Sequence, residues 1–280
     1  MKFKEAMESF MLFSVVHHSK GTHNYYKGKR KQLIIFFGDM EINTISKTNV
    51  LEFIEAQRVR NPDISNATIN KYVAALKYIL KFECKVNLEF PKLKEIHRII
   101  PTIPNNIIKL IFRHYETIKN PTPSKQRDNL MFRMLLDTGL RINELINLRI
   151  RDIDFDESTI HVKVTKSSQE RYTFFRADTH KLLNKYIITN KIEDYLFIDF
   201  RTGEQITVNS VETTCVRLKD DLNIKVSISP HKWRHTFATL FLKRNKDLEV
   251  LRLILGHSKL STTQKYLHLD KDFLHEIYFN

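Results

Sequence analysis

Apolar residues in the first hundred positions recur at spacings of three and four, which is the period of an α-helix. One such series, Phe3, Met7 and Phe10, lies at the start of the chain. Later series are separated by polar turns and predict three further helices, whose first turns lie at Thr22, at Ser46 or Thr48, and at Asn66. The pattern predicts a compact unit made only of helices.

Three prolines then interrupt the helical pattern at Pro91, Pro101 and Pro104. Proline lacks a backbone N–H group and disfavours helix in the residue before it. We therefore expect an extended connector and a boundary between two domains, residues 1–98 and residues 99–280. A connector of this kind suits two domains that close around a partner.

The pattern of the second part mixes helices with a small amount of strand. Apolar and polar residues alternate from Thr159 to Val164 and again from Arg171 to Phe175, and the polar residues between them predict a turn. Helical series surround this hairpin over residues 105–117, 126–137, 179–188, 209–222, 231–243, 248–255 and 261–268, with one more in the tail, 271–279. The predicted fold class is mainly α with a small β-hairpin or sheet (α+β).

The composition excludes several classes of protein. At 42% hydrophobic and 28% charged residues, the chain has the make-up of a folded protein, not a disordered one. Apolar runs such as residues 33–37 are far shorter than the ~20 residues of a membrane span, and the N-terminus lacks the apolar region of a signal peptide. Cys84 and Cys215 form no CxxC pattern, so we expect no disulfide framework, no metal site and a reducing cytoplasm.

The net charge of +14 points to a polyanionic partner. Residues 1–100 hold 17 Lys and Arg against 10 Asp and Glu, and the rest of the chain holds 29 against 22, so both parts are basic. Nucleic acid fits this charge better than an anionic membrane surface, and a generally Lys-rich composition explains it equally well. On the fourth predicted helix, Lys71, Lys77 and Lys81 form a basic face that suits DNA phosphates or simply water.

The segment from Thr138 to Leu145 is a candidate for phosphate chemistry. Gly139 ends one predicted helix and Arg141 begins the next, where free backbone N–H groups already favour an anion. An arginine at such a position can hold a phosphate through two parallel hydrogen bonds. A structural ion pair between Arg141 and Glu144 explains the same pattern.

His231 and Arg234 form a second candidate. They are three residues apart, so they point to one face of a helix. A histidine that exchanges protons beside a fixed cation suits phosphoryl chemistry, although a surface basic pair has the same spacing. Trp233 and His235 point elsewhere, and we expect them to be packing residues.

A third candidate follows the glycine that ends another predicted helix, Gly256. His257 lies in the turn, and a new helix capped by Ser261 or Thr262 displays Tyr266. A tyrosine hydroxyl, with a pKa near roughly 10, is a poor nucleophile at neutral pH. Surrounding cations that stabilise the phenolate would make it competent, and without them packing is the simpler role.

The fourth candidate is Lys166, in the predicted turn of the hairpin. A flexible lysine at such a tip can reach into a cleft and protonate a leaving oxygen, although most turn lysines do not.

Taken together, these residues resemble the tyrosine recombinase (phage integrase) family, of the Xer-like or small mobile-element type. The family's TGLRxxEL motif is intact at residues 138–145, HxxRHTFAT at 231–239 and LGHxxxxTTxxY at 255–266. The length of the last two motifs argues against chance agreement. The resemblance implies a helical core-binding (SAM-like) domain over residues 1–98 and a catalytic domain over 99–280.

The resemblance implies site-specific DNA recombination without a metal or nucleotide cofactor. Tyr266 would attack a backbone phosphate, form a 3′-phosphotyrosyl link and release a 5′-hydroxyl that later reseals a strand. Arg141 and Arg234 would hold the non-bridging oxygens of that phosphate.

Four further residues would assist. The family implies that Lys166 donates a proton to the leaving oxygen and that His231 assists proton transfer at the tyrosine. It also implies that His257 hydrogen-bonds the phosphate and that Glu144 orients the first arginine. The turn around Lys166 lacks the glycine common in the family, so Lys163 is the fallback for the proton donor.

The implied partners are double-stranded DNA and a homotetramer assembled on two recombination sites. The apolar tail, residues 273–279, would dock on a neighbouring subunit or fold back on its own domain. Two other classes stay open. A type IB topoisomerase-like enzyme would use similar chemistry to relax DNA, and a catalytically silent DNA-binding protein should have lost a key residue, although none is missing.

Overall fold

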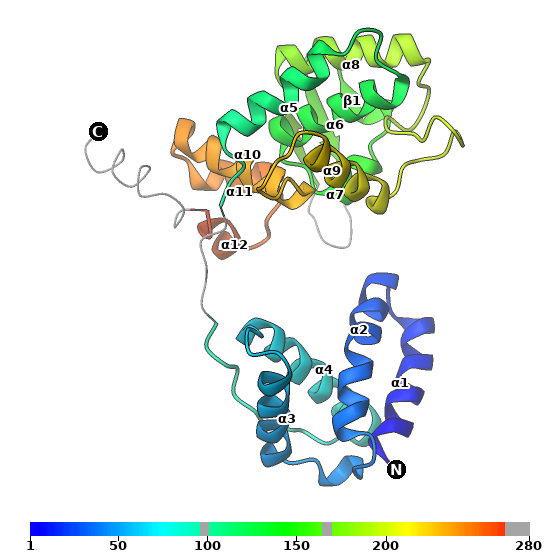
Figure 1. Ribbon diagram of the computed structural model, residues 1–280, viewed down its shortest axis with the longest axis vertical. Helices are drawn as coiled ribbons and strands as arrows, with labels where there is room; N and C mark the ends of the chain where they lie inside the picture. Colours follow the sequence, from blue (N-terminus) through cyan, green and yellow to red (C-terminus); the bar gives the residue numbers. More distant parts are fainter. Residues whose placement is uncertain (96–100, 164–169, 267–280) are drawn as a thin grey trace, which may run out of the picture. The chain divides into compact units, whose positions relative to one another are not determined.

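The helical patterns of the sequence become two units in the computed structural model, which describes residues 1–95, 101–163 and 170–266. The units are Met1–Arg98 and Ile99–Asn280 (Figure 1). Separate hydrophobic clusters fill the two units, so each is held together by its own buried side chains.

Four α-helices and one short 3₁₀-helix are described in the first unit. Their bounds are α1 Phe3–His17, α2 Lys20–Phe37, η1 Ile42–Thr44, α3 Lys47–Arg60 and α4 Asn66–Cys84. α1 packs against α2 and α4. The largest side chains buried in this unit are Phe3, Phe10, Phe37 and Phe53. Full burial of such side chains stabilises the fold by about 1.5–3 kcal/mol each.

Serine hydroxyl groups cap α2, α3 and α4 of this unit. Ser19 accepts a hydrogen bond from the backbone N–H of Thr22 at 3.3 Å, so Ser19 caps α2 and the predicted cap at Thr22 is wrong. Ser46, not Thr48, caps α3, and Ser65 caps α4. Each such cap satisfies a backbone N–H that has no partner within the helix and contributes about 1 kcal/mol.

The polar face of α4 is partly covered by the chain that follows the helix. The Asn70 side chain donates to the Leu93 carbonyl at 2.9 Å and accepts from the Leu93 N–H at 2.9 Å. Lys77 Nζ donates to a backbone carbonyl of the same segment at 3.4 Å. Lys71 and Lys81 are exposed. Of the three lysines expected to face DNA, Lys77 therefore binds the segment that follows α4, whereas the side chains of Lys71 and Lys81 are exposed to solvent.

The second unit is also mainly helical. Its described helices are α5 Asn105–Thr117, α6 Pro123–Thr138, α7 Ile142–Ile146, η2 Ile150–Asp152, α8 Ala177–Asn190, α9 Val208–Asp221, α10 Pro230–Asn245, α11 Leu248–Leu255 and α12 Leu260–Gln264. Across the described residues, no helix combines the length and apolar character needed to span a membrane.

A small antiparallel sheet completes the second unit. Its strands are β1 Ile153–Asp154, β2 Thr159–Val162 and β3 Arg171–Phe174, in the order β1-β2-β3. Val162 pairs with Arg171 across the hairpin. The pattern missed β1 because a strand of two residues has no alternation to detect. The predicted α+β class, mainly helical with a small sheet, is confirmed.

An aromatic core fixes α10 in the second unit. Trp233 is completely buried, and its ring lies 5.4 Å from that of Phe132 on α6 and 5.9 Å from that of Phe112 on α5. Trp233 is thus a packing residue, as expected. Because Arg234 follows it in the chain, this packing also sets where the guanidinium of Arg234 lies.

Candidate active site

The site begins where α6 ends and α7 begins. Gly139 caps α6 with a φ of +60°, and a Cβ at this position would collide with the ring of Phe237. Glycine therefore meets both the backbone and the space requirement. Arg141 follows as the N-cap of α7, and its backbone N–H donates to Glu144 Oε2 at 2.7 Å. This turn holds Arg141 and Glu144 side by side.

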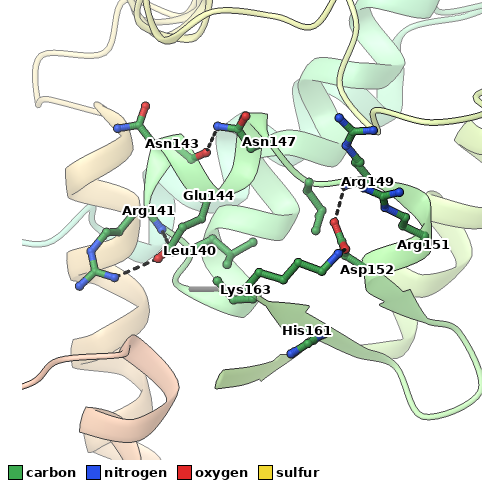
Figure 2. A pocket seen from close by; sticks show the side chains of 12 residues that line it. Leu140, Arg141, Asn143, Glu144, Asn147, Arg149, Arg151, Asp152, His161 and Lys163 are labelled. Atoms are coloured by element: carbon green, nitrogen blue, oxygen red, sulfur yellow. Dashed lines mark hydrogen bonds and ion pairs between the residues drawn. The ribbon is translucent and has the colours of Figure 1, made fainter. Parts of the chain in front are cut away.

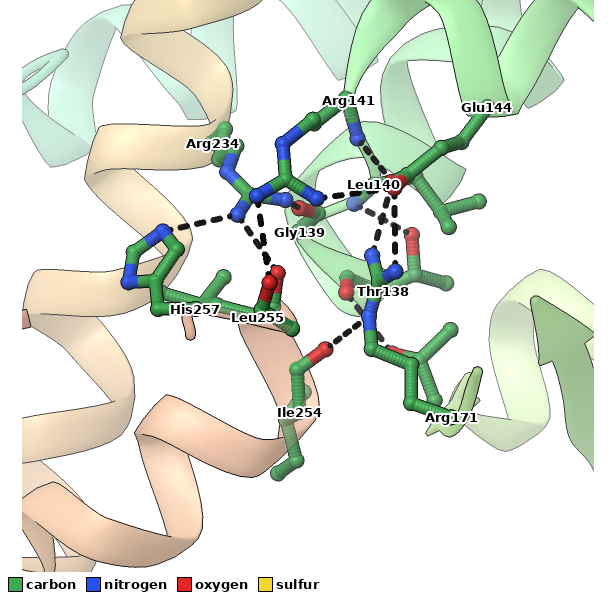
Figure 3. Close-up of polar contacts among 12 residues, drawn as sticks. Thr138, Gly139, Leu140, Arg141, Glu144, Arg171, Arg234, Ile254, Leu255 and His257 are labelled. Atoms are coloured by element: carbon green, nitrogen blue, oxygen red, sulfur yellow. Dashed lines mark hydrogen bonds and ion pairs between the residues drawn. The ribbon is translucent and has the colours of Figure 1, made fainter. Parts of the chain in front are cut away.

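The Glu144 carboxylate lies in the middle of a cluster of arginines (Figure 3). It accepts from Arg141 Nη1 at 2.9 Å and from Arg171 Nη1 and Nη2 at 3.0 and 2.7 Å. Burial by itself would raise the pKa of Glu144, but the hydrogen bonds and charge of Arg171, joined by Arg141, lower the pKa to about 2. The carboxylate is therefore ionised at neutral pH and orients both guanidinium groups.

Arg234 brings a third guanidinium to the same place from α10. Its Nη1 donates to the Gly139 carbonyl at 2.5 Å, and its Nη2 donates to the Leu255 carbonyl at 2.8 Å. Burial, assisted by the charge of Arg141, lowers the pKa of Arg234 to about 10. The group remains a cation at neutral pH, so the ends of α6 and α11 hold a fixed positive charge between them.

His257 follows Gly256, which ends α11. Its Nε2 lies 3.0 Å from Arg234 Nη2, and its Nδ1 lies 2.9 Å from the Thr263 hydroxyl. Since a guanidinium can only donate, Nε2 accepts and Nδ1 carries the proton. Burial, and then the charges of Arg234 and Arg141, lower the pKa of His257 to about 4. The imidazole is therefore neutral at physiological pH.

Tyr266 lies beside this histidine. Its ring is nearly parallel to that of His257, with centroids 6.2 Å apart, and meets the ring of His235 edge-on at 5.1 Å. Burial raises the pKa of Tyr266 and outweighs the opposing effect of Arg234 and Arg141. The hydroxyl is thus protonated in this arrangement, with two cations close enough to favour its phenolate.

The helix before Tyr266 differs from the prediction. α12 starts after Lys259, which provides no side-chain cap, so the predicted caps at Ser261 and Thr262 are wrong. The helix ends at Gln264, and Tyr266 lies in the following turn, where its N–H donates to the Thr263 carbonyl at 2.9 Å. The tail expected to dock on another subunit, residues 273–279, lies outside the described residues.

A cavity of about 440 Å³ adjoins Arg141 and Glu144 (Figure 2). Lys163 and Asp152 line its other side, and Lys163 Nζ donates to the Asp152 carboxylate at 2.5 Å. The fallback proton donor is therefore already held by an ion pair. Lys166, the first choice for that role, lies outside the described residues.

His231 stands apart from the cluster. It lies in the first turn of α10, three residues before Arg234, and its side chain is exposed. The hydrogen bonds that join Arg141, Glu144, Arg234 and His257 do not include it. The structure thus brings together four of the predicted polar residues and Tyr266, while His231 is exposed to solvent on α10.

Two residues of the cluster were missed by the sequence reasoning. Arg171 was noted only as the start of a strand, yet its guanidinium binds Glu144. The available signal was its place on the inward side of an alternating strand, where an arginine needs a buried partner. Thr263, part of the TTxxY motif, holds the His257 ring by its hydroxyl, and short-range spacing gave no hint of that contact.

The described residues offer no metal site. Within them, no three His, Cys, Asp or Glu side chains come together in a way that could hold a metal ion. The charged groups that face Tyr266 are guanidinium groups, which can act on a phosphate by themselves.

Comparison with known proteins identifies relatives over most of the chain. Residues 102–272 match the model of the phage integrase family. Tyrosine recombinase XerA of Saccharolobus solfataricus is 34% identical over 226 residues, which cover 80% of this chain and 71% of the relative. A tyrosine recombinase of Pseudothermotoga lettingae is 29% identical over 263 residues, which cover 87% and 86%.

Solved structures share the fold. The integrase of the Tn1549 transposon, in complex with transposon right end DNA, superposes with a TM-score of 0.78 at 19% identity, over 99% of this chain and 98% of the other. The XerH site-specific recombinase bound to its difH substrate superposes with a TM-score of 0.73 at 21% identity, over 92% and 79%.

Proposed function

The chain belongs to the phage integrase family of tyrosine recombinases, and from this premise we propose how its residues cut and rejoin DNA. Membership makes it a site-specific recombinase that acts on double-stranded DNA. The observation that carries the assignment of residues is the convergence of Arg141, Arg234 and His257 on Tyr266.

Tyr266 is the nucleophile in this proposal. Its oxygen forms a bond to the backbone phosphorus while the bond to the 5′ oxygen breaks, which leaves a 3′-phosphotyrosyl link and a 5′-hydroxyl. The tyrosine proton leaves, and one proton reaches the 5′ oxygen. Because the link conserves the phosphodiester energy, a 5′-hydroxyl from the partner strand reverses the step without ATP. Neither a metal nor a nucleotide cofactor is needed.

Arg141 and Arg234 stabilise the charge that develops on the phosphate. Both are held in place before DNA arrives, Arg141 by Glu144 and Arg234 by carbonyl groups. Donors that are already oriented spend no free energy on rearrangement when the transition state forms. Arg141 is the more accessible of the two, since 24% of its side chain is exposed.

His257 has two roles in the proposal. Without DNA it accepts from Arg234 and so orients that guanidinium. Contact with the phosphate requires Nε2 to release Arg234 and take up a proton, or the ring to turn. His231, on the exposed side of α10, assists proton transfer at Tyr266, and Lys166 protonates the leaving 5′ oxygen.

The two units divide the work of binding. Residues 1–98 form the core-binding domain, with Lys71 and Lys81 facing phosphates, and residues 99–280 form the catalytic domain. Four copies assemble on two recombination sites in the cytoplasm. The excess of basic residues in both regions supports this division, because each can contact the DNA backbone.

A nicked suicide substrate tests the nucleophile. Wild-type protein should form a covalent protein–DNA adduct, visible on a denaturing gel, and Tyr266→Phe should form none while it binds the site as tightly. Tyr172→Phe is the matched control, since Tyr172 is exposed on β3 and also loses only a hydroxyl. An adduct of wild-type yield from Tyr266→Phe would overturn the assignment.

The two-site reaction separates recombination from topoisomerase-like relaxation. Wild-type protein should exchange strands between two copies of its site. If it relaxed supercoiled plasmids but never joined two sites, the topoisomerase-like alternative would replace the proposal.

A further inference from the structure

Arg171 is turned into the protein. Its side chain is 5% exposed, against 24% for Arg141. Its Nε donates to the Ile254 carbonyl at 2.6 Å, and its two other nitrogens donate to the two oxygens of Glu144. Arg171 therefore does not reach DNA from this position and can act on the reaction only through its neighbours.

One carboxylate serves two arginines. Glu144 accepts from the side chain and the backbone N–H of Arg141 at 2.9 and 2.7 Å, in addition to its two bonds from Arg171. Its single negative charge is thus divided between the two guanidinium groups. Without Arg171, the whole charge would act on Arg141, and the protein interior screens such an attraction poorly.

Arg171 also supports Arg141 from a second side. A Cβ added to Gly256 would lie 2.9 Å from Arg171 Cδ, so the stem of Arg171 packs directly under Gly256. The Gly256 carbonyl in turn accepts from Arg141 Nη2 at 3.3 Å. The same arginine therefore contacts both groups that hold Arg141.

We propose that Arg171 is a positioning residue that neutralises Glu144, so that the positive charge of Arg141 stays available for the DNA phosphate. The inference rests on the proposed role of Arg141. In a purely structural role, by contrast, Arg171 would only join β3 to α7 and α11, and its loss would affect every substrate equally.

The test compares two suicide substrates, one with a normal scissile phosphate and one with a neutral methylphosphonate there. Arg171→Gln should slow adduct formation about 100-fold on the phosphate, the size of effect seen when one charge-stabilising donor is lost. On the methylphosphonate, which carries less charge for Arg141 to offset, the defect should shrink to about tenfold or less. Arg171→Lys keeps the charge but not the two-nitrogen pairing with Glu144, so on the phosphate it should be faster than Arg171→Gln and slower than wild type.

Controls separate the possible causes. Arg133→Gln removes a different ion pair of the same unit, Arg133 with Glu116, and should leave both rates unchanged. Thermal unfolding of each variant shows that it is folded at the assay temperature. If Arg171→Gln fails to fold, Arg171→Met, an uncharged straight side chain of similar length, is measured in its place: a larger defect on the phosphate than on the methylphosphonate supports the proposal, and a wild-type ratio of the two rates overturns it.

An equal defect of Arg171→Gln on both substrates, or no defect at all, would also overturn the positioning role. Failure of the wild-type protein to form any adduct would instead refute the proposed function, so the two failures are distinguishable.

Discussion

Arg234 donates to His257 Nε2 at 3.0 Å, so the imidazole stays neutral as long as this bond persists. Burial and the neighbouring arginines oppose its protonation down to a pKa of about 4. In the unfolded chain the same ring takes up a proton near pH 6.5. Between these two values the unfolded state binds one proton more, so a falling pH favours unfolding.

This difference predicts a stability effect of a single residue. The free energy of unfolding of the wild-type protein should fall by on the order of 3 kcal/mol through His257 as the pH drops from 6.5 to 4. His257→Gln lacks that contribution and should lose less stability over the same range. Urea unfolding at pH 7.5 and 4.5 measures it, and equal losses in the two proteins would contradict the lowered pKa.

Glu144 takes up its proton at a lower pH than His257 does. Its pKa is lowered to about 2, so its contribution to stability is present above pH 4.5 and is lost only as the pH falls toward 2. The pH 4.5 measurement therefore leaves Glu144 almost untouched, and the comparison with His257→Gln removes the contribution of His235, whose pKa burial also lowers.

Single residues also show where sequence reasoning succeeds and fails. Arg141, Arg234, His257 and Tyr266 were predicted because each lies in a motif of local spacing. The contact of Arg171 with Glu144 joins residues 27 positions apart, and no local pattern encodes it. Likewise, the pairing of His257 with Arg234 depends on how α10 and α11 pack, which is decided by the whole core.

At the scale of helices, several described C-caps adopt a left-handed backbone. Glycine occupies this position at Gly139 and Gly256, whereas lysine does so at Lys85, Lys191 and Lys246, with φ of 51° to 56°. A side chain with a Cβ is strained in this region by about 1–2 kcal/mol, and glycine is not.

The strain predicts that Lys191→Gly stabilises the protein. Relief of the left-handed strain should exceed the entropic cost of glycine and raise the free energy of unfolding by about 0.5–1 kcal/mol. Lys185→Gly, in the exposed interior of the same helix, is the control and should lower it by about 1 kcal/mol. Chemical denaturation of both variants gives the comparison, and a loss of stability in each would exclude the strain.

The sequence patterns predicted which segments form helices better than they predicted the first residue of each helix. The periodic apolar series over α5 and α11 gave their bounds directly, because packing and propensity agree there. The start of α2 was misplaced because Ser19 and Thr22 are both capping residues three positions apart, and only the backbone geometry shows which of them accepts the bond. The end of α12 at Gln264 has no glycine or proline to mark it.

For the whole molecule, basic charge on both units predicts a steep salt dependence of DNA binding. Replacing Lys71 and Lys81 together by Gln should reduce the slope of log K against log salt by about two, since each contact with a phosphate contributes roughly 0.9. Lys77→Gln is the control on the same helix and should change the slope little, because Lys77 is bound to the connector. If the slope of log K against log salt were the same in wild type and all variants, Lys71 and Lys81 would not contact DNA phosphates.

A second prediction at this scale is that DNA cleavage needs no metal ion. Adduct formation should persist in excess EDTA, since guanidinium groups supply the positive charge in the proposed mechanism. Loss of cleavage that magnesium restores would contradict it.

Besides the Glu144 carboxylate, four main-chain carbonyl groups accept hydrogen bonds from the arginines of the site, those of Gly139, Ile254, Leu255 and Gly256. A carbonyl is the same whichever amino acid carries it. The side chains at 254 and 255 are buried in an apolar cluster, so they can change among apolar residues that fill the same space, while a Cβ at either glycine would collide with its neighbours. In a saturation library selected for recombination, the first pair should accept several apolar residues and the second pair almost no replacement.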